Sequence, residues 1–260
     1  MRIRVAGHFG EWLQGRLGAD GPVVLVTLPC PALALEGSAL PGPMRVQGMT
    51  ARAAREFLRP LGLRLPGRVR LRAGVAPGLG CGMSTARLVA LAGLAGWDGP
   101  PEALAQVCVE FEGASDPLMF ARPERLLWAS RLGLALDALP ALPRHDLIGG
   151  FFGGPVRTEP QDERFPDISD LIAGWQEARD LAGFAALASE SAQRTLALRG
   201  PRGDPIAALA RELGALGHVI AHTGAARGLI FGPGTVPAHA RDALRAAGLR
   251  GVMQMRAGGA

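Results

Sequence analysis

A glycine-rich stretch between an apolar run and a helical pattern constrains the fold of this chain more than any other feature. It reads Gly78-Leu79-Gly80-Cys81-Gly82-Met83-Ser84-Thr85-Ala86. Glycines at alternating positions allow positive φ angles and let a ligand approach the backbone closely. The hydroxyl pair Ser84-Thr85 stands where the helix begins, beside unpaired N–H groups and the positive end of the helix dipole. The stretch therefore predicts an anion site, in the first place for phosphate. The alternative is that the two hydroxyl groups only cap the helix.

Length and composition are those of a globular protein. The 260 residues fit one large domain or two closely joined ones, with 48% hydrophobic and 20% charged residues. No apolar run is long enough to span a membrane, and the first residues lack a secretory layout. The three cysteines, Cys30, Cys81 and Cys108, have no metal-ligand spacing. We expect reduced thiols in a cytoplasmic protein.

The basic charge does not indicate a nucleic-acid partner. The net charge is +5 at pH 7, every basic residue other than histidine is arginine, and only 5% of residues are aromatic. In the densest run, Arg68, Arg70 and Arg72 alternate with apolar residues at the period of a strand. A half-solvated strand explains this pattern better than a polyanion stripe, which would need interleaved aromatic residues.

Hydrophobic periodicity and turn residues predict an α+β chain in two lobes. A turn is expected at Gly7–Gly10, and the glycine-rich corner Gly149–Gly154 is the candidate boundary between lobes 1–148 and 149–260. The predicted strands are 3–5, 23–27, 32–35, 68–75, 146–148, 227–231 and 252–255. The predicted helices are 51–58 after a Thr50 cap, 85–95, 101–111, 124–132, 168–182, 183–197, 205–216 and 238–247.

Four segments in chain order resemble the GHMP small-molecule kinases, and among these the L-threonine kinases of cobalamin synthesis and propanediol utilisation. The opening pattern of those enzymes, Gly-x-x-Gly-Glu-Leu-x-Gln-Gly, is matched at Gly7, Gly10, Glu11, Gln14 and Gly15. The other segments are the glycine-rich loop, Glu110–Asp116 and His222–Gly228. The resemblance spans nearly the whole chain, and the opening pattern is its most specific part.

The resemblance implies a two-lobed GHMP kinase fold. Its N-terminal lobe would resemble the second domain of a small-subunit ribosomal protein, and its C-terminal lobe would be ferredoxin-like. The implied activity is ATP-dependent phosphorylation of a small hydroxyl substrate, first of all L-threonine to O-phospho-L-threonine for the cobalamin nucleotide loop. ATP and Mg²⁺ would be the cofactors and a small molecule the partner, with neither nucleic acid nor membrane. A homodimer is left open.

Residue roles follow from the same resemblance. The phosphates would lie on Gly78, Leu79, Gly80, Cys81, Gly82, Met83, Ser84 and Thr85. Ser84 and Glu112 would hold Mg²⁺, with Glu110 as an alternative ligand, and Asp116 would orient or deprotonate the acceptor. Gly10 and Glu11 would shape the substrate pocket together with His222, Thr223 and Gly224, and Glu11 would suit a substrate ammonium group. His8 is interpreted as a turn residue, because relatives carry a smaller group there.

The sequence also departs from the family pattern. Leu79 replaces a lysine and Met83 replaces a serine, while Arg87 and Arg157 stand where relatives carry aspartate. The two changes from aspartate to arginine bring into question how the chain would bind a metal ion and which substrate it would accept. One alternative is therefore a kinase for another amino alcohol or a homoserine-like substrate. Another is a catalytically weak nucleotide-binding protein of the same fold.

Overall fold

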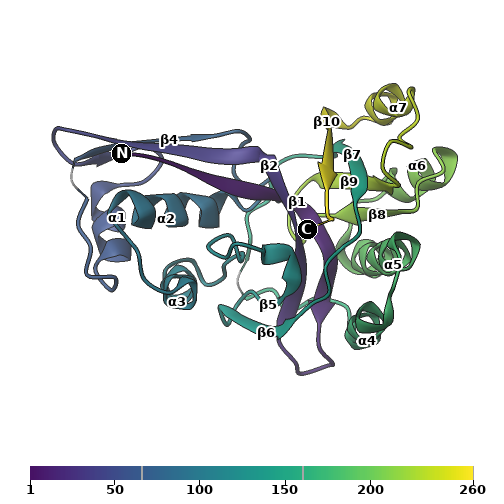
Figure 1. Cartoon of the computed structure of the whole chain (residues 1–260), viewed down its shortest axis with the longest axis horizontal. Helices are drawn as coiled ribbons and strands as arrows, with labels where there is room; N and C mark the ends of the chain where they lie inside the picture. The colour runs from purple at the N-terminus through teal and green to yellow at the C-terminus, as the bar shows by residue number, and fades with distance from the viewer. Residues whose placement is uncertain (66, 160, 260) are drawn as a thin grey trace.

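The strands of this protein form a single sheet (Figure 1). The computed structural model describes residues 1–65, 67–159 and 161–259. Within these ranges, ten strands pair in the order β10-β7-β9-β8-β1-β2-β4-β3, with β5 on β2 and β6 on β5. The strands are β1 (Arg2–Arg16), β2 (Val23–Leu40), β3 (Arg45–Val46), β4 (Arg68–Ala73), β5 (Leu126–Ala129), β6 (Leu134–Ala138), β7 (His145–Phe151), β8 (Gly217–Ile220), β9 (Ala226–Phe231) and β10 (Arg250–Ala257). The predicted α+β class is confirmed.

The helices fall into two groups along the sheet. In Figure 1, α1, α2 and α3 lie beside the β4 end, while α5, α6 and α7 lie on the side of β7 to β10 and α4 lies below α5. The helices are α1 (Ala51–Leu58), α2 (Met83–Leu94), α3 (Pro101–Glu112), α4 (Ser169–Glu177), α5 (Leu181–Arg199), α6 (Ile206–Glu212) and α7 (Ala240–Ala246), with a short 3₁₀ turn, η1 (Pro123–Arg125). Within the described ranges, no helix combines the length and apolarity that crossing a membrane requires. The lobe boundary after residue 148 falls inside β7 and stays a prediction.

The first two strands are much longer than the sequence predicts. The expected turn at Gly7–Gly10 is wrong, because these residues lie within β1. The β1–β2 register shifts between Val5 and Gly7 and again between His8 and Glu11, so the strand bends without ending. Residues 7–15 of this central strand are all buried, and a strand covered on both faces shows no alternating pattern.

The predicted helix over 124–132 is also wrong. Its residues form η1 and then β5, which pairs with β2 through Val24–Ala129 and Leu25–Trp128. Trp128 is fully buried, and its indole N–H donates to the Ser115 carbonyl over 2.7 Å. A short apolar run can form either element, and tertiary pairing decides here.

The apolar core holds two helices against β1. Helix α2 packs on β1 and β2, and α5 packs on β1 and β8. Leu88 and Leu91 of α2 and Phe184 of α5 are fully or almost fully buried. This packing fixes the N-terminus of α2 beside the bend of β1, where the candidate site lies.

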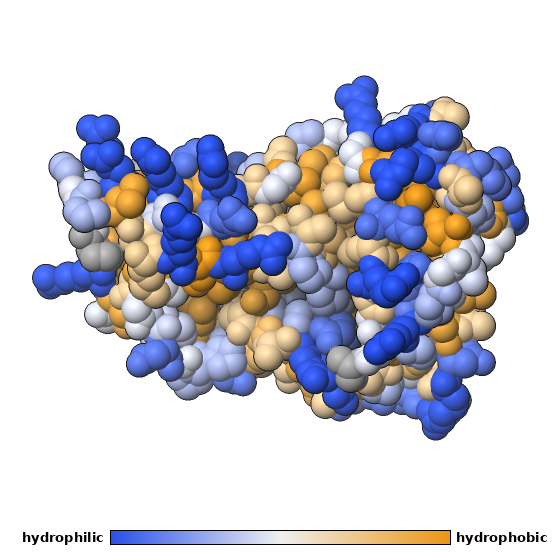
Figure 2. Space-filling view, turned by 45° about the horizontal axis from the view of Figure 1, so that its top comes forward, coloured by the Kyte–Doolittle hydropathy of each residue, from blue (hydrophilic) through white to orange (hydrophobic). Residues whose placement is uncertain are grey.

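Strand β4 carries its arginines outward, as the period-two pattern predicts. Arg68, Arg70 and Arg72 are exposed while Val69 and Leu71 are buried. Hydrophilic side chains stand in a row over the corresponding end of the molecule in Figure 2. The arginines therefore form the solvated face of a strand.

Candidate active site

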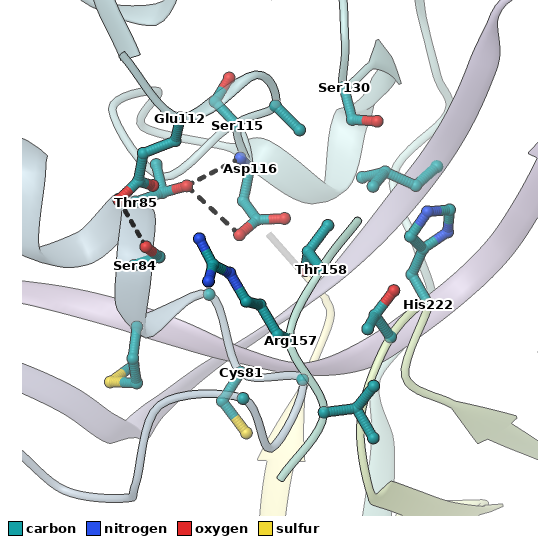
Figure 3. Close-up of a pocket in the computed structure, with 18 of the residues that line it drawn as sticks. Cys81, Ser84, Thr85, Glu112, Ser115, Asp116, Ser130, Arg157, Thr158 and His222 are labelled. Carbon is teal, nitrogen blue, oxygen red and sulfur yellow. Dashed lines mark hydrogen bonds between the residues drawn. The ribbon is translucent and has the colours of Figure 1, made fainter. Parts of the chain in front are cut away.

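One cavity of about 690 Å³ brings together residues of all four predicted segments. Figure 3 shows its residues from the glycine-rich loop, the end of α3 and the turn after β8. β1 contributes His8 and Glu11, and the glycine-rich loop contributes Gly78, Gly80, Cys81 and Gly82. The N-terminus of α2 contributes Met83, Ser84 and Thr85. Glu112 comes from the end of α3, Asp116 follows it, and His222 and Thr223 come from the turn after β8. Gly10, Leu79 and Gly224 do not line the cavity. They shape its walls through backbone contacts.

The glycine-rich loop closes against the turn after β8. Gly78, Gly80 and Gly82 have φ angles of +85°, +79° and +68°, which only glycine adopts without strain. The Leu79 carbonyl accepts hydrogen bonds from the N–H groups of Ala225 and Ala226, each over 3.1 Å. A Cβ on Gly80 would lie 2.6 Å from the Thr223 carbonyl oxygen. These contacts explain why glycines are needed here and hold the loop in place.

The N-terminus of α2 has no side-chain cap within the described structure. Its N-cap is Gly82, which has no side-chain oxygen, and the adjacent hydroxyl groups are engaged elsewhere. The Ser84 hydroxyl donates to Glu112, and the Thr85 hydroxyl accepts from the Asp116 backbone N–H over 3.1 Å. The capping alternative is therefore wrong for both residues. The first N–H groups of α2 are left available for an anion in the cavity.

Ser84 and Glu112 form a pair of oxygen donors at the helix N-terminus. Their Oγ and Oε1 atoms lie 2.6 Å apart, and burial raises the pKa of Glu112 against the opposing influence of Ser84 and Arg87. Magnesium takes one or two protein oxygens together with phosphate oxygens and waters, so the donor set fits this ion. Glu112 lines the cavity, whereas Glu110 is exposed and does not.

Arg87 lies against this oxygen pair. Its guanidinium is 3.4 Å from the Ser84 Oγ and 3.7 Å from the Glu112 Oε1, and it donates to the Gly48 carbonyl over 2.9 Å. A cation thus already partly neutralises the carboxylate that Mg²⁺ would use. The departure from the family pattern at this position touches the predicted metal site directly.

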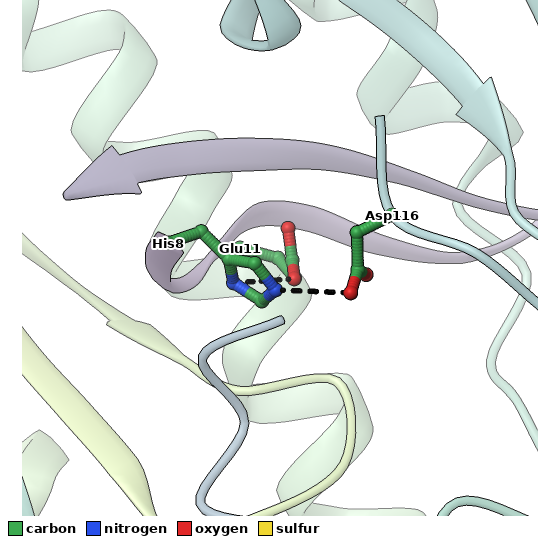
Figure 4. A group of neighbouring side chains, drawn as sticks. All are labelled: His8, Glu11 and Asp116. Atoms are coloured by element: carbon green, nitrogen blue, oxygen red, sulfur yellow. Dashed lines mark ion pairs between the residues drawn. The ribbon is translucent and has the colours of Figure 1, made fainter. Parts of the chain in front are cut away.

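A buried histidine joins two carboxyl groups at the floor of the cavity (Figure 4). His8 Nδ1 lies 3.3 Å from the Glu11 Oε1, and His8 Nε2 lies 3.5 Å from the Asp116 Oδ2. A Cβ on Gly82 would lie 2.6 Å from the His8 ring, so the loop covers the imidazole closely. His8 is therefore part of the site and not the turn residue that the sequence suggests.

The charges in this cluster are coupled. Burial alone would lower the pKa of His8, but Glu11 and Asp116 outweigh it and raise the pKa to about 9. The pKa of Glu11 is raised to about 8, mainly by burial. The charge of His8 acts to lower this pKa, and the charge of Asp116 acts to raise it further. Burial acts to raise the pKa of Asp116 as well, yet His8 lowers it below its usual value. The three groups therefore titrate as one coupled cluster, in which the Asp116 carboxylate is the group held ionised. Binding of a substrate ammonium group by Glu11 stays a prediction.

This cluster predicts a pH-dependent stability. His8 binds its proton more tightly in the folded chain (pKa about 9) than at its ordinary value of 6.5. Its stabilising contribution is therefore complete below pH 6.5 and is lost as the pH rises through about 9. Glu11 acts in the same direction, since its pKa rises from 4.5 to about 8. We expect the melting temperature to fall over pH 6.5 to 9.5, and to fall clearly less in a His8→Gln/Glu11→Gln double variant. Equal slopes in both proteins would contradict the proton coupling.

Three further cavity residues carry no signal in the sequence. Phe165 stacks on His222 with ring centroids 4.4 Å apart, and the guanidinium groups of Arg199 and Arg131 lie over the same Phe165 ring. Arg199 and Phe165 come from segments outside the four resembling ones, and Arg131 is one arginine among many. Only the fold brings them to one cavity.

Comparison with known proteins gives the fold but no close relative. No protein-family model matches the sequence, and no curated protein sequence matches it. Among solved structures, the mevalonate kinase of Methanococcus jannaschii superposes with a TM-score of 0.67 at 12% identity, over 98% of this chain and 97% of that chain. A putative homoserine kinase from Listeria monocytogenes gives a TM-score of 0.62 at 16% identity, over 99% of this chain and 96% of that chain. The chain has the GHMP kinase fold.

A third solved structure supports the same conclusion. A 4-(cytidine 5'-diphospho)-2C-methyl-D-erythritol kinase gives a TM-score of 0.54 at 23% identity, over 100% of both chains. At these identities the matches establish the fold, as expected from the sequence. The reaction and the substrate have to be argued from the cavity.

Proposed function

We propose that this chain is an ATP-dependent kinase that transfers a phosphoryl group to the hydroxyl group of a small molecule. The observation that carries the proposal is that one cavity holds an uncapped helix N-terminus, the Ser84–Glu112 oxygen pair and the carboxylate of Asp116. Phosphoryl transfer depends mainly on positioning and on neutralising charge, and little on covalent chemistry by the protein. Solved structures of the same fold are named as kinases of mevalonate and homoserine.

The donor side of the site is the glycine-rich loop with the start of α2. The backbone N–H groups there would bind the phosphates of ATP, because they have no partner within the described part of helix α2 and stand at its positive end. Ser84 and Glu112 would hold Mg²⁺. When bound, this ion neutralises phosphate charge.

The acceptor side is the cluster of the buried His8 and Glu11 with the half-buried Asp116. Asp116 would accept the proton of the acceptor hydroxyl as the new O–P bond forms. The imidazolium of His8, 3.5 Å from the Asp116 Oδ2, keeps this half-buried carboxylate ionised. His8 thus acts as a positioning residue, and its charge replaces the solvent that burial removes.

For the acceptor we propose L-threonine, giving O-phospho-L-threonine for cobalamin nucleotide-loop synthesis in the cytoplasm. The resemblance of Gly7–Gly15 to the opening pattern of L-threonine kinases supports this choice. A homoserine-like acid or another amino alcohol is the alternative acceptor. The ATP and Mg²⁺ requirement and the division into lobes 1–148 and 149–260 belong to the same proposal.

Ser84→Ala is expected to reduce turnover more than binding. Its hydroxyl lies 2.6 Å from Glu112 at the helix N-terminus, where negative charge would build up during transfer. Loss of one such contact commonly costs on the order of 10²-fold in kcat. Steady-state kinetics should show this loss with the KM for ATP changed by less than about threefold. Ser38→Ala, on β2 outside the cavity, is the matched control. A normal kcat would reduce Ser84 to a structural role.

A second candidate function is nucleotide binding with weak catalysis. It is favoured by Arg87, which contacts both predicted metal ligands and would compete with Mg²⁺ for Glu112. Arg87→Asp restores the residue type of the family pattern. If the chain is a weak kinase for this reason, the substitution should raise kcat at low Mg²⁺ concentration. A further drop in kcat would instead show that the guanidinium assists the reaction.

The direct test is ATP consumption in the presence of different acceptors. Purified protein with Mg²⁺ and ATP should produce ADP with L-threonine faster than with L-serine, L-homoserine or 1-amino-2-propanol. Turnover of homoserine but not of threonine would overturn the substrate and leave the kinase assignment standing. If none of the acceptors raises ADP formation above the rate with ATP alone, the kinase proposal is wrong.

A further inference from the structure

A second charged group of residues lies in the same cavity, apart from the reaction cluster. Phe165 is buried (8% exposed), and its ring stacks on His222 with an interplanar angle of 5°. The Cζ atom of Arg199 lies 4.3 Å from the centroid of the Phe165 ring, and that of Arg131 lies 5.5 Å from it. All four residues line the cavity. Stacking on an aromatic face holds a guanidinium in a fixed orientation.

The positive charge of this group is only partly neutralised. Arg199 has one carboxylate contact in the described structure, to Asp162 over 3.2 Å. That carboxylate is already held by Arg164, through hydrogen bonds of 2.9 Å and 3.1 Å. Arg131 donates to the backbone carbonyl of Asp162, while the carboxylates of Asp162 and Glu163 attract it through space without a direct ion pair in the described structure. The Nη1 atom of Arg199 is buried and has no partner among the described residues.

Burial makes this charge unfavourable without a ligand. It lowers the pKa of both Arg131 and Arg199, against the opposing attraction of Asp162. Both side chains remain guanidinium ions at neutral pH, so they gain most from an anion that enters the cavity. A bidentate anion, carboxylate or phosphate, matches the guanidinium donors.

His222 connects this group to the reaction cluster. Burial and the charge of Arg199 lower the pKa of His222 to about 3, while Asp116 acts in the opposite direction. The imidazole is therefore neutral at pH 7 and lies within electrostatic reach of both the arginines and Asp116. Because Arg131, Arg199 and Asp116 line one cavity, a small molecule that fills it can hold an anionic end on the arginines and a hydroxyl group at Asp116.

We propose that Arg131 and Arg199, held on Phe165, form an anion subsite for the acceptor, so that the substrate carries a carboxylate or phosphate group besides its hydroxyl group. This inference rests on the proposed kinase function and narrows its substrate class. Amino alcohols without an anionic group are excluded as preferred acceptors, whereas a hydroxy amino acid or a phosphorylated alcohol is allowed.

Matched acceptors test the subsite. The kcat/KM for ATP-dependent phosphorylation is measured with L-threonine and L-homoserine, which carry a carboxylate, and with glycerol 3-phosphate, which carries a phosphate. L-threoninol, L-homoserine amide and glycerol are their counterparts without the anion. We expect at least one anionic acceptor to exceed its counterpart by about 10- to 100-fold, the range of one charge-assisted hydrogen bond. A preference for glycerol 3-phosphate would identify the anion as phosphate, and a preference for either amino acid as carboxylate.

Three arginine variants show whether Arg199 causes the preference for anionic acceptors. Arg199→Met should remove most of the preference for the anionic acceptor. The kcat/KM for the counterpart without the anion and the KM for ATP should stay unchanged. Arg199→Lys should retain part of this preference. Arg202 is exposed and does not line the cavity, so Arg202→Met should retain all of the preference. The inference is overturned if Arg199→Met slows both acceptor classes equally or raises only the KM for ATP. It is also overturned if wild-type protein uses uncharged acceptors as well as anionic ones, although the kinase function then stands. If no acceptor of either class is phosphorylated, the kinase proposal itself fails.

Discussion

Asp116→Asn is expected to lower kcat by roughly 10²- to 10⁴-fold, the range that loss of a general base gives. Asp116 is a cavity carboxylate that the neighbouring His8 keeps ionised, at 3.5 Å, and ground-state binding of ATP has no need of that charge. The affinity for Mg·ATP, measured by calorimetry, should therefore change by less than about threefold. Asparagine has nearly the same shape, and the hydrogen bond from the backbone N–H of residue 116 to the Thr85 hydroxyl does not involve the carboxylate.

The controls for this variant separate three roles. Asp20→Asn, at an exposed position that does not line the cavity, should behave as wild type. If Asp116→Asn weakens Mg·ATP binding together with kcat, the carboxylate serves the metal and not the acceptor. If the variant keeps both rate and affinity, Asp116 is structural and the proposed proton transfer is wrong.

Glu112→Gln is expected to produce the second largest effect, in the Mg²⁺ dependence. Its Oε1 lies 2.6 Å from the Ser84 Oγ at the helix N-terminus, and an amide is a poor ligand for Mg²⁺ compared with a carboxylate. We expect the Mg²⁺ concentration for half-maximal activity to rise by at least about 10-fold, as for weakened metal sites generally. Removing the carboxylate also frees Arg87, which lies 3.7 Å from Glu112.

Glu110→Gln is the matched control for this experiment. Glu110 lies on the same helix two residues earlier, is exposed, and does not line the cavity. It should leave the Mg²⁺ dependence unchanged. If Glu110→Gln shifts the Mg²⁺ requirement and Glu112→Gln does not, the metal-ligand assignment must be exchanged between the two residues.

Local signals in the sequence predict several elements well. Thr50 caps α1 by accepting from the Ala53 N–H over 3.1 Å, as its position before an amphipathic run suggests. Strand β4 shows the predicted alternation of buried apolar residues and exposed arginines. The glycine-rich loop does precede a helix, because positive φ angles and a helix start both depend on neighbouring residues alone. The GHMP kinase fold is confirmed at the level of structure.

The parts that sequence reasoning missed depend on distant contacts. β1 looks like a strand and a turn because its glycines mark bends of a long buried strand. Glu11 is near His8 in the sequence, but the role of His8 depends on its second partner, Asp116, which lies 3.5 Å away in space and more than a hundred positions along the chain. The same holds for Arg131 and Arg199, which meet only over Phe165. No local rule predicts that these charges share one cavity.

Phosphorus NMR of a reaction with ATP, Mg²⁺ and L-threonine tests the proposed phosphoryl transfer most directly. The proposed function predicts that a phosphomonoester signal grows in step with ADP, with one ester formed per ADP, and that Asp116→Asn suppresses both signals. L-Homoserine and glycerol 3-phosphate in place of threonine extend the test to the other acceptors considered. The phosphoryl transfer would be contradicted if ADP appears only with inorganic phosphate. It would equally be contradicted if calorimetry shows ATP binding but no ester forms with any of these acceptors.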